Sequence, residues 1–137
     1  MAGNIVSGPE VGHWVASKHG GNYAESTSQA IGLERDGKLI AGVIYEGWNH
    51  KSIVCHIAIE GAVTRAFMKA VCEYAFHTCG AHKVIGPIPS DNEKAIKNAA
   101  RIGFTEEARI KDAAPNGDII MFTITADQCR FLGVKNG

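Results

Sequence analysis

The chain has 137 residues, 45% of them hydrophobic, and its 14 basic residues are balanced by 14 acidic ones. This length supports one hydrophobic core but not two full domains, so we expect a single domain over residues 1–137. The zero net charge argues against nucleic-acid binding through an overall basic field, and no apolar run reaches the roughly 18 residues of a membrane span.

The cysteines indicate the redox compartment. All four (Cys55, Cys72, Cys79 and Cys129) lie mostly in apolar stretches without CxxC pairing. This pattern predicts reduced thiols in a cytosol-like compartment rather than a disulfide framework. Residues 1–8 lack the basic and apolar regions of a signal peptide, so we expect a cytoplasmic protein. Glycine is unusually frequent, with 16 residues, which predicts many tight turns or close backbone approaches.

A short helix is the first predicted element. Ser7 and Glu10 have capping-box spacing, Pro9 suits a first helical turn, and Gly20-Gly21 predicts the end of the helix.

Three antiparallel strands are predicted next, over residues 29–35, 38–46 and 52–59. Asp36-Gly37 is a strong two-residue hairpin signal between the first two strands. In the third strand the side chains alternate between the faces of the sheet. One face carries Ile53, Cys55, Ile57 and Ile59, and the other carries Val54, His56 and Ala58.

The second half is predicted to alternate helices and strands. Apolar residues at helical spacing from Val63 to Ala75 predict a helix that Gly80 ends. A strand follows over residues 83–88. Because Pro87 and Pro89 cannot donate ladder hydrogen bonds, we expect one side of this strand to be unpaired.

The last predicted helix begins at a second capping box formed by Ser90 and Glu93, with Ser90 as the N-cap, and ends near Ile102 before Gly103. Strands over residues 105–112 and 118–125 are joined by the turn sequence of residues 113–117. The complete order, α-β-β-β-α-β-α-β-β, predicts an α+β fold with α/β layers, in which helices flank a mixed sheet.

This element order occurs together with a characteristic set of residues in the second half: Tyr74-Ala75-Phe76, Gly80, Val84, Asn92, Gly103-Phe104, Arg109 and Lys111-Asp112. Over about residues 28–126 the chain resembles the GNAT acetyltransferase superfamily, and its RimJ/RimL-like branch in particular. Small phage-encoded members are similar in length, which implies a bacterial or phage-infected host cell. The strand that usually opens the fold is short or missing here.

The resemblance implies a mostly antiparallel sheet splayed between strands 52–59 and 83–88. It implies an N-acetyltransferase that moves an acetyl group from acetyl-CoA to an amine of a small molecule, a protein N-terminus or a lysine. In the family, acetyl-CoA enters between the fourth and fifth strands, and its pyrophosphate sits on the loop that opens the main helix. The implied cofactor-binding residues are Ile57, Ala58, Ile59, Gly61, Ala62, Val63, Thr64, Arg65, Lys69 and Asn92.

The phosphate loop departs from the family pattern Q/R-x-x-G-x-G/A. Only Gly61 and Ala62 are small, the basic opening residue is absent, and Glu60 lies nearby. Arg65 and Lys69 can supply the positive charge, or they can form an ordinary solvated helix face. Asn92 is likewise either a cofactor contact or a first-turn structural residue.

His56 is the first candidate for chemistry, because a histidine on this strand has a pKa suited to deprotonating an amine. Glu46 is the spare carboxylate, so His56 and Glu46 are the catalytic candidates. A core or shape role for His56 is the alternative. Tyr45, Trp48 and Asn49 cluster at the turn before the third strand, where they can line an acceptor pocket or form an ordinary loop.

Other features are given structural interpretations. Tyr74 lies on the apolar helix stripe and is expected in the core. His77, Cys79 and His82 have the wrong spacing for a zinc site, so no metal is expected. Residues 97–102 contain no tyrosine to protonate a leaving thiolate.

Two alternatives to an enzyme stay open. One is a non-catalytic acyl-CoA-binding protein of the same fold, and the other is a phage accessory or structural protein. A homodimer is also open, because residues 128–134 place Phe131 and Leu132 after the last strand.

Overall fold

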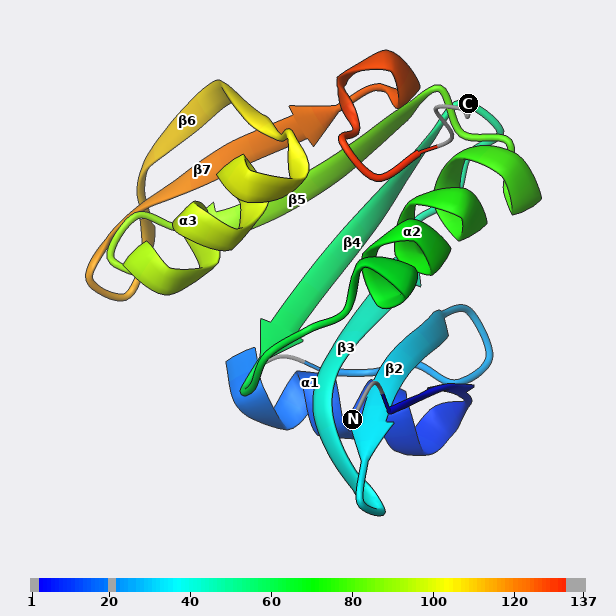
Figure 1. Ribbon diagram of the computed structural model, residues 1–137. Coiled ribbons are helices and arrows are strands. Elements are labelled where there is room, and N and C mark those ends of the chain that lie inside the picture. Colours follow the sequence, from blue (N-terminus) through cyan, green and yellow to red (C-terminus); the bar gives the residue numbers. More distant parts are fainter. Residues whose placement is uncertain (1–2, 20–21, 133–137) are drawn as a thin grey trace.

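The structure is a computed structural model that describes residues 3–19 and 22–132. Its elements follow the chain in the order β1 (Asn4–Ser7), α1 (Pro9–His19), β2 (Gln29–Arg35), β3 (Lys38–Glu46), β4 (Ser52–Ile59), α2 (Arg65–Glu73), the π-helical turn η1 (Tyr74–Thr78), β5 (Lys83–Pro89), α3 (Glu93–Ile102), β6 (Thr105–Ala114), β7 (Gly117–Ile124) and the 3-10 turn η2 (Ala126–Gln128). The described strands form one sheet in the order β1-β2-β3-β4-β5-β7-β6 (Figure 1). Neighbouring strands are antiparallel except β4 and β5, which confirms the predicted mixed, mostly antiparallel sheet.

The three consecutive strands β2, β3 and β4 have the predicted bounds, and Asp36-Gly37 forms the predicted turn. Asp36 and Gly37 both have positive φ, as expected for this kind of hairpin turn.

The beginning of the chain differs from the prediction. Residues 4–7 form a short strand antiparallel to β2, with Asn4 opposite Glu34 and Ser7 opposite Ile31. Ser7 therefore belongs to a strand, and the helix begins at Pro9. The helix end predicted at Gly20-Gly21 lies outside the described residues. A segment of four residues, in which apolar and polar side chains alternate only weakly, does not predict a strand by itself. It is a strand here because it pairs with β2.

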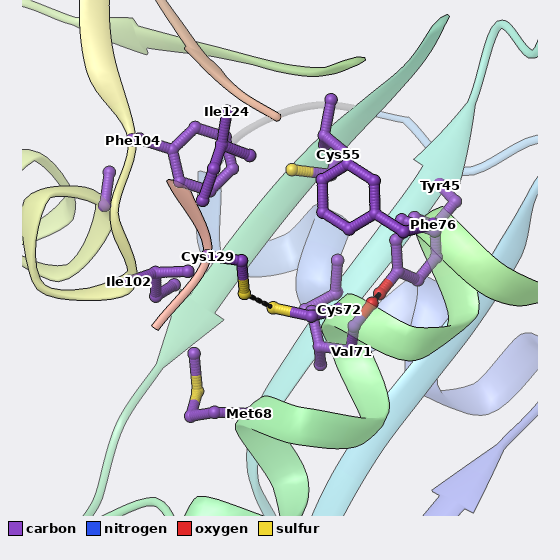
Figure 2. Close-up of a cluster of buried hydrophobic side chains, with 14 of the residues drawn as sticks. Tyr45, Cys55, Met68, Val71, Cys72, Phe76, Ile102, Phe104, Ile124 and Cys129 are labelled. Atoms are coloured by element: carbon purple, nitrogen blue, oxygen red, sulfur yellow. Dashed lines mark hydrogen bonds between the residues drawn. The ribbon is translucent and has the colours of Figure 1, made fainter. Parts of the chain in front are cut away.

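Helices cover both faces of the sheet. On one face, α1 packs against β2, β3 and β4, where Val15 and Ile44 are fully buried. Glycine allows this close approach: a Cβ at Gly42 would lie 2.6 Å from Val15 Cγ2. On the opposite face, α2 and α3 cover a larger apolar cluster that includes Tyr45, Val71 and Ile124 (Figures 1 and 2).

The beginning of α3 corrects one prediction. Asn92 is the N-cap, and its side-chain oxygen accepts a hydrogen bond from the Ala95 N–H at 3.2 Å. Ser90, the predicted N-cap, instead accepts from the Asp118 N–H at 3.0 Å and so ties the end of β5 to β7. Both residue types cap helices, so local sequence did not separate them. Gly103 ends α3 as predicted, with a φ of 127°.

None of the helices in the described part of the chain has the length and apolar character needed to cross a bilayer.

Candidate functional site

The two parallel strands β4 and β5 are paired at only one end. Ser52, Ile53 and Val54 lie opposite Lys83, Val84 and Ile85, and there the pairing stops. Beyond this point the two strands diverge (Figure 1), while each continues to pair with its outer neighbour, β3 or β7. The predicted splay between these two strands is confirmed.

The direction of the β4 backbone groups follows from its ladder with β3. Glu60 N–H donates to the Ile40 carbonyl at 2.7 Å, so Ile40 and Glu60 form a hydrogen-bonded pair. Such pairs alternate along an antiparallel ladder, so His56 and Ala58 bond to β3. The backbone groups of Ile57 and Ile59 therefore point into the gap, as the cofactor prediction requires, whereas those of Ala58 do not.

The prolines of β5 face the same gap. Ser90 N–H donates to the Asp118 carbonyl at 2.9 Å, so the even-numbered residues of β5 bond to β7. Pro87 and Pro89 therefore direct their ring nitrogens toward β4, where no ladder donor is needed. Across the gap, β4 presents N–H and C=O groups, whereas β5 at these two residues presents only carbonyl acceptors.

A cavity of about 590 Å³ occupies the gap. Its apolar wall comes from the two strands and from the face of α3, and its polar lining residues are Lys18, His56, Asp91, Asn92 and Asn98. Sequence reasoning did not single out Lys18, Asp91 or Asn98. They come from α1, the β5–α3 loop and α3, which are brought together only by the packing of these elements around the splay.

His56, which lines this cavity, is hydrogen-bonded to Glu46, which does not line it. The distance from His56 Nε2 to a Glu46 carboxylate oxygen is 2.6 Å, and the exposed fractions of the two side chains are 22% and 37%. The register places Ile44 opposite His56, so Glu46 reaches the ring diagonally from β3 on the same face. A carboxylate accepts the Nε2 proton, which makes Nδ1 the basic nitrogen of the neutral ring.

The loop between β4 and α2 holds the predicted phosphate-binding residues. Thr64 is the N-cap of α2, and its hydroxyl accepts from the Phe67 N–H at 3.0 Å. Gly61 and Ala62 are exposed before it. The Glu60 carboxylate lies 3.6 Å from the ammonium group of Lys18, so this loop also carries an ion pair to α1.

A second cavity of about 140 Å³ lies beside the first turn of α2. Two cations line it, Arg65 from α2 and Arg101 from α3, and Asn98 borders both cavities. The Arg65 guanidinium lies over the Phe131 ring, 5.6 Å from its centroid. Lys69, one turn further along α2, is exposed and does not line this cavity. Arg101 was missed because its closeness to Arg65 depends on the packing of α3 beside α2.

Tyr45, which was expected at an acceptor pocket, lies in the core. It is 2% exposed, and its hydroxyl donates to the Val71 carbonyl at 2.6 Å (Figure 2). Asn49 uses its side-chain oxygen to accept from the backbone N–H groups of Lys51 and Ser52, which orders the β3–β4 turn. Trp48 is 49% exposed, and its ring contacts that of His50 at a tilt of 47°. This turn lies at the paired end of β4 and β5, away from both cavities.

Two further groups bear on the chemistry of the site. Cys55 lines the larger cavity, but burial raises the pKa of its thiol to about 12, so it is not a thiolate nucleophile at neutral pH. Tyr74 packs against Tyr45 with ring centroids 4.8 Å apart, beside the core as expected. Within residues 3–19 and 22–132, no three metal-ligating side chains are clustered.

No protein-family model matches the chain, and no curated protein matches it in sequence. Solved structures do match. A chimera of the spermidine N-acetyltransferase SpeG from Vibrio cholerae and hSSAT is 22% identical with a TM-score of 0.62, over 80% of this chain and 73% of that one. SpeG from the same organism in complex with manganese ions is 20% identical with a TM-score of 0.61, over 80% and 70% of the two chains.

A third match is yncA from Salmonella typhimurium, whose structure contains its cofactor acetyl-CoA. It is 16% identical with a TM-score of 0.60, over 72% of this chain and 64% of that one, so this chain spans less than two thirds of the length of yncA. This chain has the GNAT acetyltransferase fold. At these identities the likeness establishes the fold, and the residues of this chain have to carry the argument about its chemistry.

Proposed function

We propose that this protein is an N-acetyltransferase that moves an acetyl group from acetyl-CoA to an amine. The observation that carries the proposal is the cavity between β4 and β5, which His56 lines while its ring is hydrogen-bonded to Glu46. The fold is shared with proteins named as N-acetyltransferases, and one of them was solved with acetyl-CoA. The amine acceptor is proposed by analogy with the spermidine acetyltransferases.

Acetyl-CoA fits the gap by its chemistry. Its pantetheine arm carries amides that can pair with the outward-facing groups of Ile57 and Ile59, as a strand added to a sheet edge does. Its phosphates would lie near the N-terminal end of α2, where Arg65 and Arg101 provide positive charge. Asn92 lines the larger cavity while it caps α3, so its proposed contact with the cofactor is limited by the hydrogen bond it already makes.

The proposed reaction is a direct transfer. His56 accepts a proton from the acceptor amine, directly or through water, while Glu46 holds the ring and stabilises the imidazolium that forms. The amine nitrogen forms a bond to the thioester carbon, and the backbone N–H groups near Ile57 and Ile59 stabilise the negative charge on its oxygen. The carbon–sulfur bond then breaks, and CoA leaves as a thiolate, which an ordinary thiol pKa of about 8.5 allows.

The finer assignments are part of the same proposal. A place in the RimJ/RimL-like branch is supported by the residues from Tyr74 to Asp112 that resemble it. A phage or bacterial origin, a cytoplasmic location and a protein or small-molecule acceptor are consistent with that resemblance. Homodimer formation is a further expectation, and the segment that motivated it, residues 128–134, is described only as far as Leu132.

An acetyl-transfer assay with a panel of amines tests the proposal. We expect His56→Ala to lower kcat by about 100-fold or more, because a general base typically contributes 10²–10⁴-fold. Glu46→Gln should cause a smaller loss, because Gln keeps the contact but not the charge. The matched control is His13→Ala, which removes an exposed histidine whose Nε2 lies 2.7 Å from Glu25, outside both cavities.

Two outcomes would go against this mechanism. Unchanged turnover in His56→Ala would remove His56 from the reaction but leave the enzyme class intact. Acetyl-CoA binding without transfer to any amine would favour a non-catalytic acyl-CoA-binding protein.

A further inference from the structure

Cys72 and Cys129 bring two distant parts of the chain into sulfur–sulfur contact. Cys72 belongs to α2, and Cys129 follows η2 near the end of the described chain. Their Sγ atoms lie 2.7 Å apart, and the two residues are 5% and 7% exposed (Figure 2). Both are free thiols in this structure. A contact this short places them within reach of a covalent bond after a small movement of either side chain.

The two thiols differ in character. The Cys72 and Cys129 sulfurs share a hydrogen bond, and the backbone N–H groups of Phe131 and Leu132 also donate to the Cys129 sulfur. These bonds lower the pKa of Cys129 to about 7. The same hydrogen bond, together with burial, raises the pKa of Cys72. Cys129 is therefore the more acidic of the two thiols.

The other two cysteines lack this arrangement. Burial raises the pKa of Cys55 to about 12, and its sulfur lies beside Gly86, where no sulfur–sulfur hydrogen bond is formed. Cys79 is half-buried after η1, where it shares a hydrogen bond with Tyr74. The Cys72–Cys129 pair is thus distinguished by both contact and polarisation.

The segment that carries Cys129 contacts both α3 and α2. Arg130 N–H donates to the Ile102 carbonyl at 3.1 Å at the end of α3, and Phe131 lies beneath the Arg65 guanidinium at the beginning of α2. Phe131 also forms part of the wall of the smaller cavity. A covalent bond from Cys129 to Cys72 would hold this wall against α2.

We propose that Cys72 and Cys129 form a reversible disulfide on reaction with a hydroperoxide, and that this bond ties residues 126–132 to α2. The proposal is independent of acetyl transfer. Because both sulfurs are buried, the oxidant must be as small as hydrogen peroxide. A dithiol reductant returns the pair to the free thiols by exchange.

The reaction balances in two steps. The Cys129 thiolate attacks one peroxide oxygen, the O–O bond breaks, and a sulfenic acid and hydroxide form. The Cys72 sulfur then attacks the sulfenic sulfur, the S–O bond breaks, and the disulfide forms as the second oxygen leaves as water. In total, two thiols and one hydrogen peroxide give one disulfide and two waters, and peroxide is the species reduced.

Peptide mapping of the peroxide-treated full chain tests the proposal. After blocking of the remaining thiols in denaturant, trypsin should release residues 70–83 joined to residues 112–130, with two hydrogen atoms fewer than the separate peptides. Because residues 70–83 also contain Cys79, fragmentation must assign the bond to Cys72. Cys79→Ser is the matched control and should keep the cross-link, whereas Cys72→Ser and Cys129→Ser should lose it.

A second measurement requires no variant. A disulfide between residues 72 and 129 restricts the unfolded chain, so the Tm of the oxidised protein should rise by about 10 °C and return after treatment with a dithiol. A cross-link through Cys79 or Cys55, or oxidation of Cys129 to sulfinic acid without a cross-link, would overturn the proposal. So would a cross-linked protein with an unchanged or lower Tm.

Discussion

The Tyr45 hydroxyl shows how a single residue can be misassigned from sequence. Tyr45 is the penultimate residue of β3, close to a polar turn, and there it looks like part of a binding surface. In the structure its ring is buried, and its hydroxyl satisfies the Val71 carbonyl just before α2 changes into the π-helical turn η1. Residues 41–45 of β3 are all buried, so alternation along the strand did not reveal which side chains face a ligand.

Tyr45→Phe should therefore destabilise the protein by about 1 kcal/mol, because it removes a buried hydrogen bond while the Val71 carbonyl keeps the Tyr74 N–H as a donor. Urea unfolding measures this change. Tyr23→Phe is the control, because the Tyr23 hydroxyl lies 3.4 Å from the Ser28 carbonyl and contributes a weak bond. Equal losses for the two variants would show that the Tyr45 hydrogen bond has no special role.

The two catalytic candidates could be chosen from the sequence by residue type alone. His56 and Glu46 were separate candidates in the sequence, each chosen for its ability to carry a proton. Their pairing depends on the register of β3 and β4, which places them on one face within hydrogen-bond distance. Trp48 and Asn49 were candidates for an acceptor pocket because aromatic and polar residues cluster at their turn. In the structure this turn lies at the end of β4 that pairs with β5, away from the gap.

At the level of elements, the splay of β4 and β5 was predictable and β1 was not. Pro87 and Pro89 carry a physical constraint that any sheet must respect, because a proline cannot donate a ladder hydrogen bond. Pro87 and Pro89 were therefore sufficient to predict the gap between β4 and β5. By contrast, β1 exists only through its pairing with β2, a long-range contact that four residues do not encode.

The end of α3 packs closely against η2, a segment that lies more than 20 residues further along the chain. Gly103 has a φ of 127°, and a Cβ there would meet the carbonyl oxygen of Gln128 in η2. Gly80, at the end of η1, has a φ of 70° but open space around it. Alanine at Gly80 would therefore introduce only backbone strain, whereas alanine at Gly103 would also clash with another segment.

We expect Gly103→Ala to destabilise the protein by about 3 kcal/mol and Gly80→Ala by about 1 kcal/mol. Both changes place alanine at positive φ, but the first also forces η2 away from α3. Thermal and urea unfolding of the two variants provide the comparison. If Gly80→Ala cost as much as Gly103→Ala, the packing of residues 126–132 on α3 would not contribute.

At the level of the whole molecule, the fold was predictable and the complete lining of the site was not. The order of elements and the residues from Tyr74 to Asp112 led to the GNAT fold, which the similarity to solved structures confirms. The basic pair Arg65 and Arg101 and the ring of Phe131 come from three separate segments. No spacing in the sequence joins them, because their proximity arises from α2, α3 and the last turn packing together.

The central claim is that the gap between β4 and β5 binds acetyl-CoA, and calorimetric titration of the full chain with acetyl-CoA tests it most directly. We predict saturable binding of one ligand per chain, weakened about tenfold by Arg65→Ala or Arg101→Ala because each removes a charged partner of the phosphates. Lys38→Ala, which removes a positive charge at the distant β2–β3 turn, should bind as the unaltered chain does. No detectable binding at about millimolar acetyl-CoA would contradict the claim.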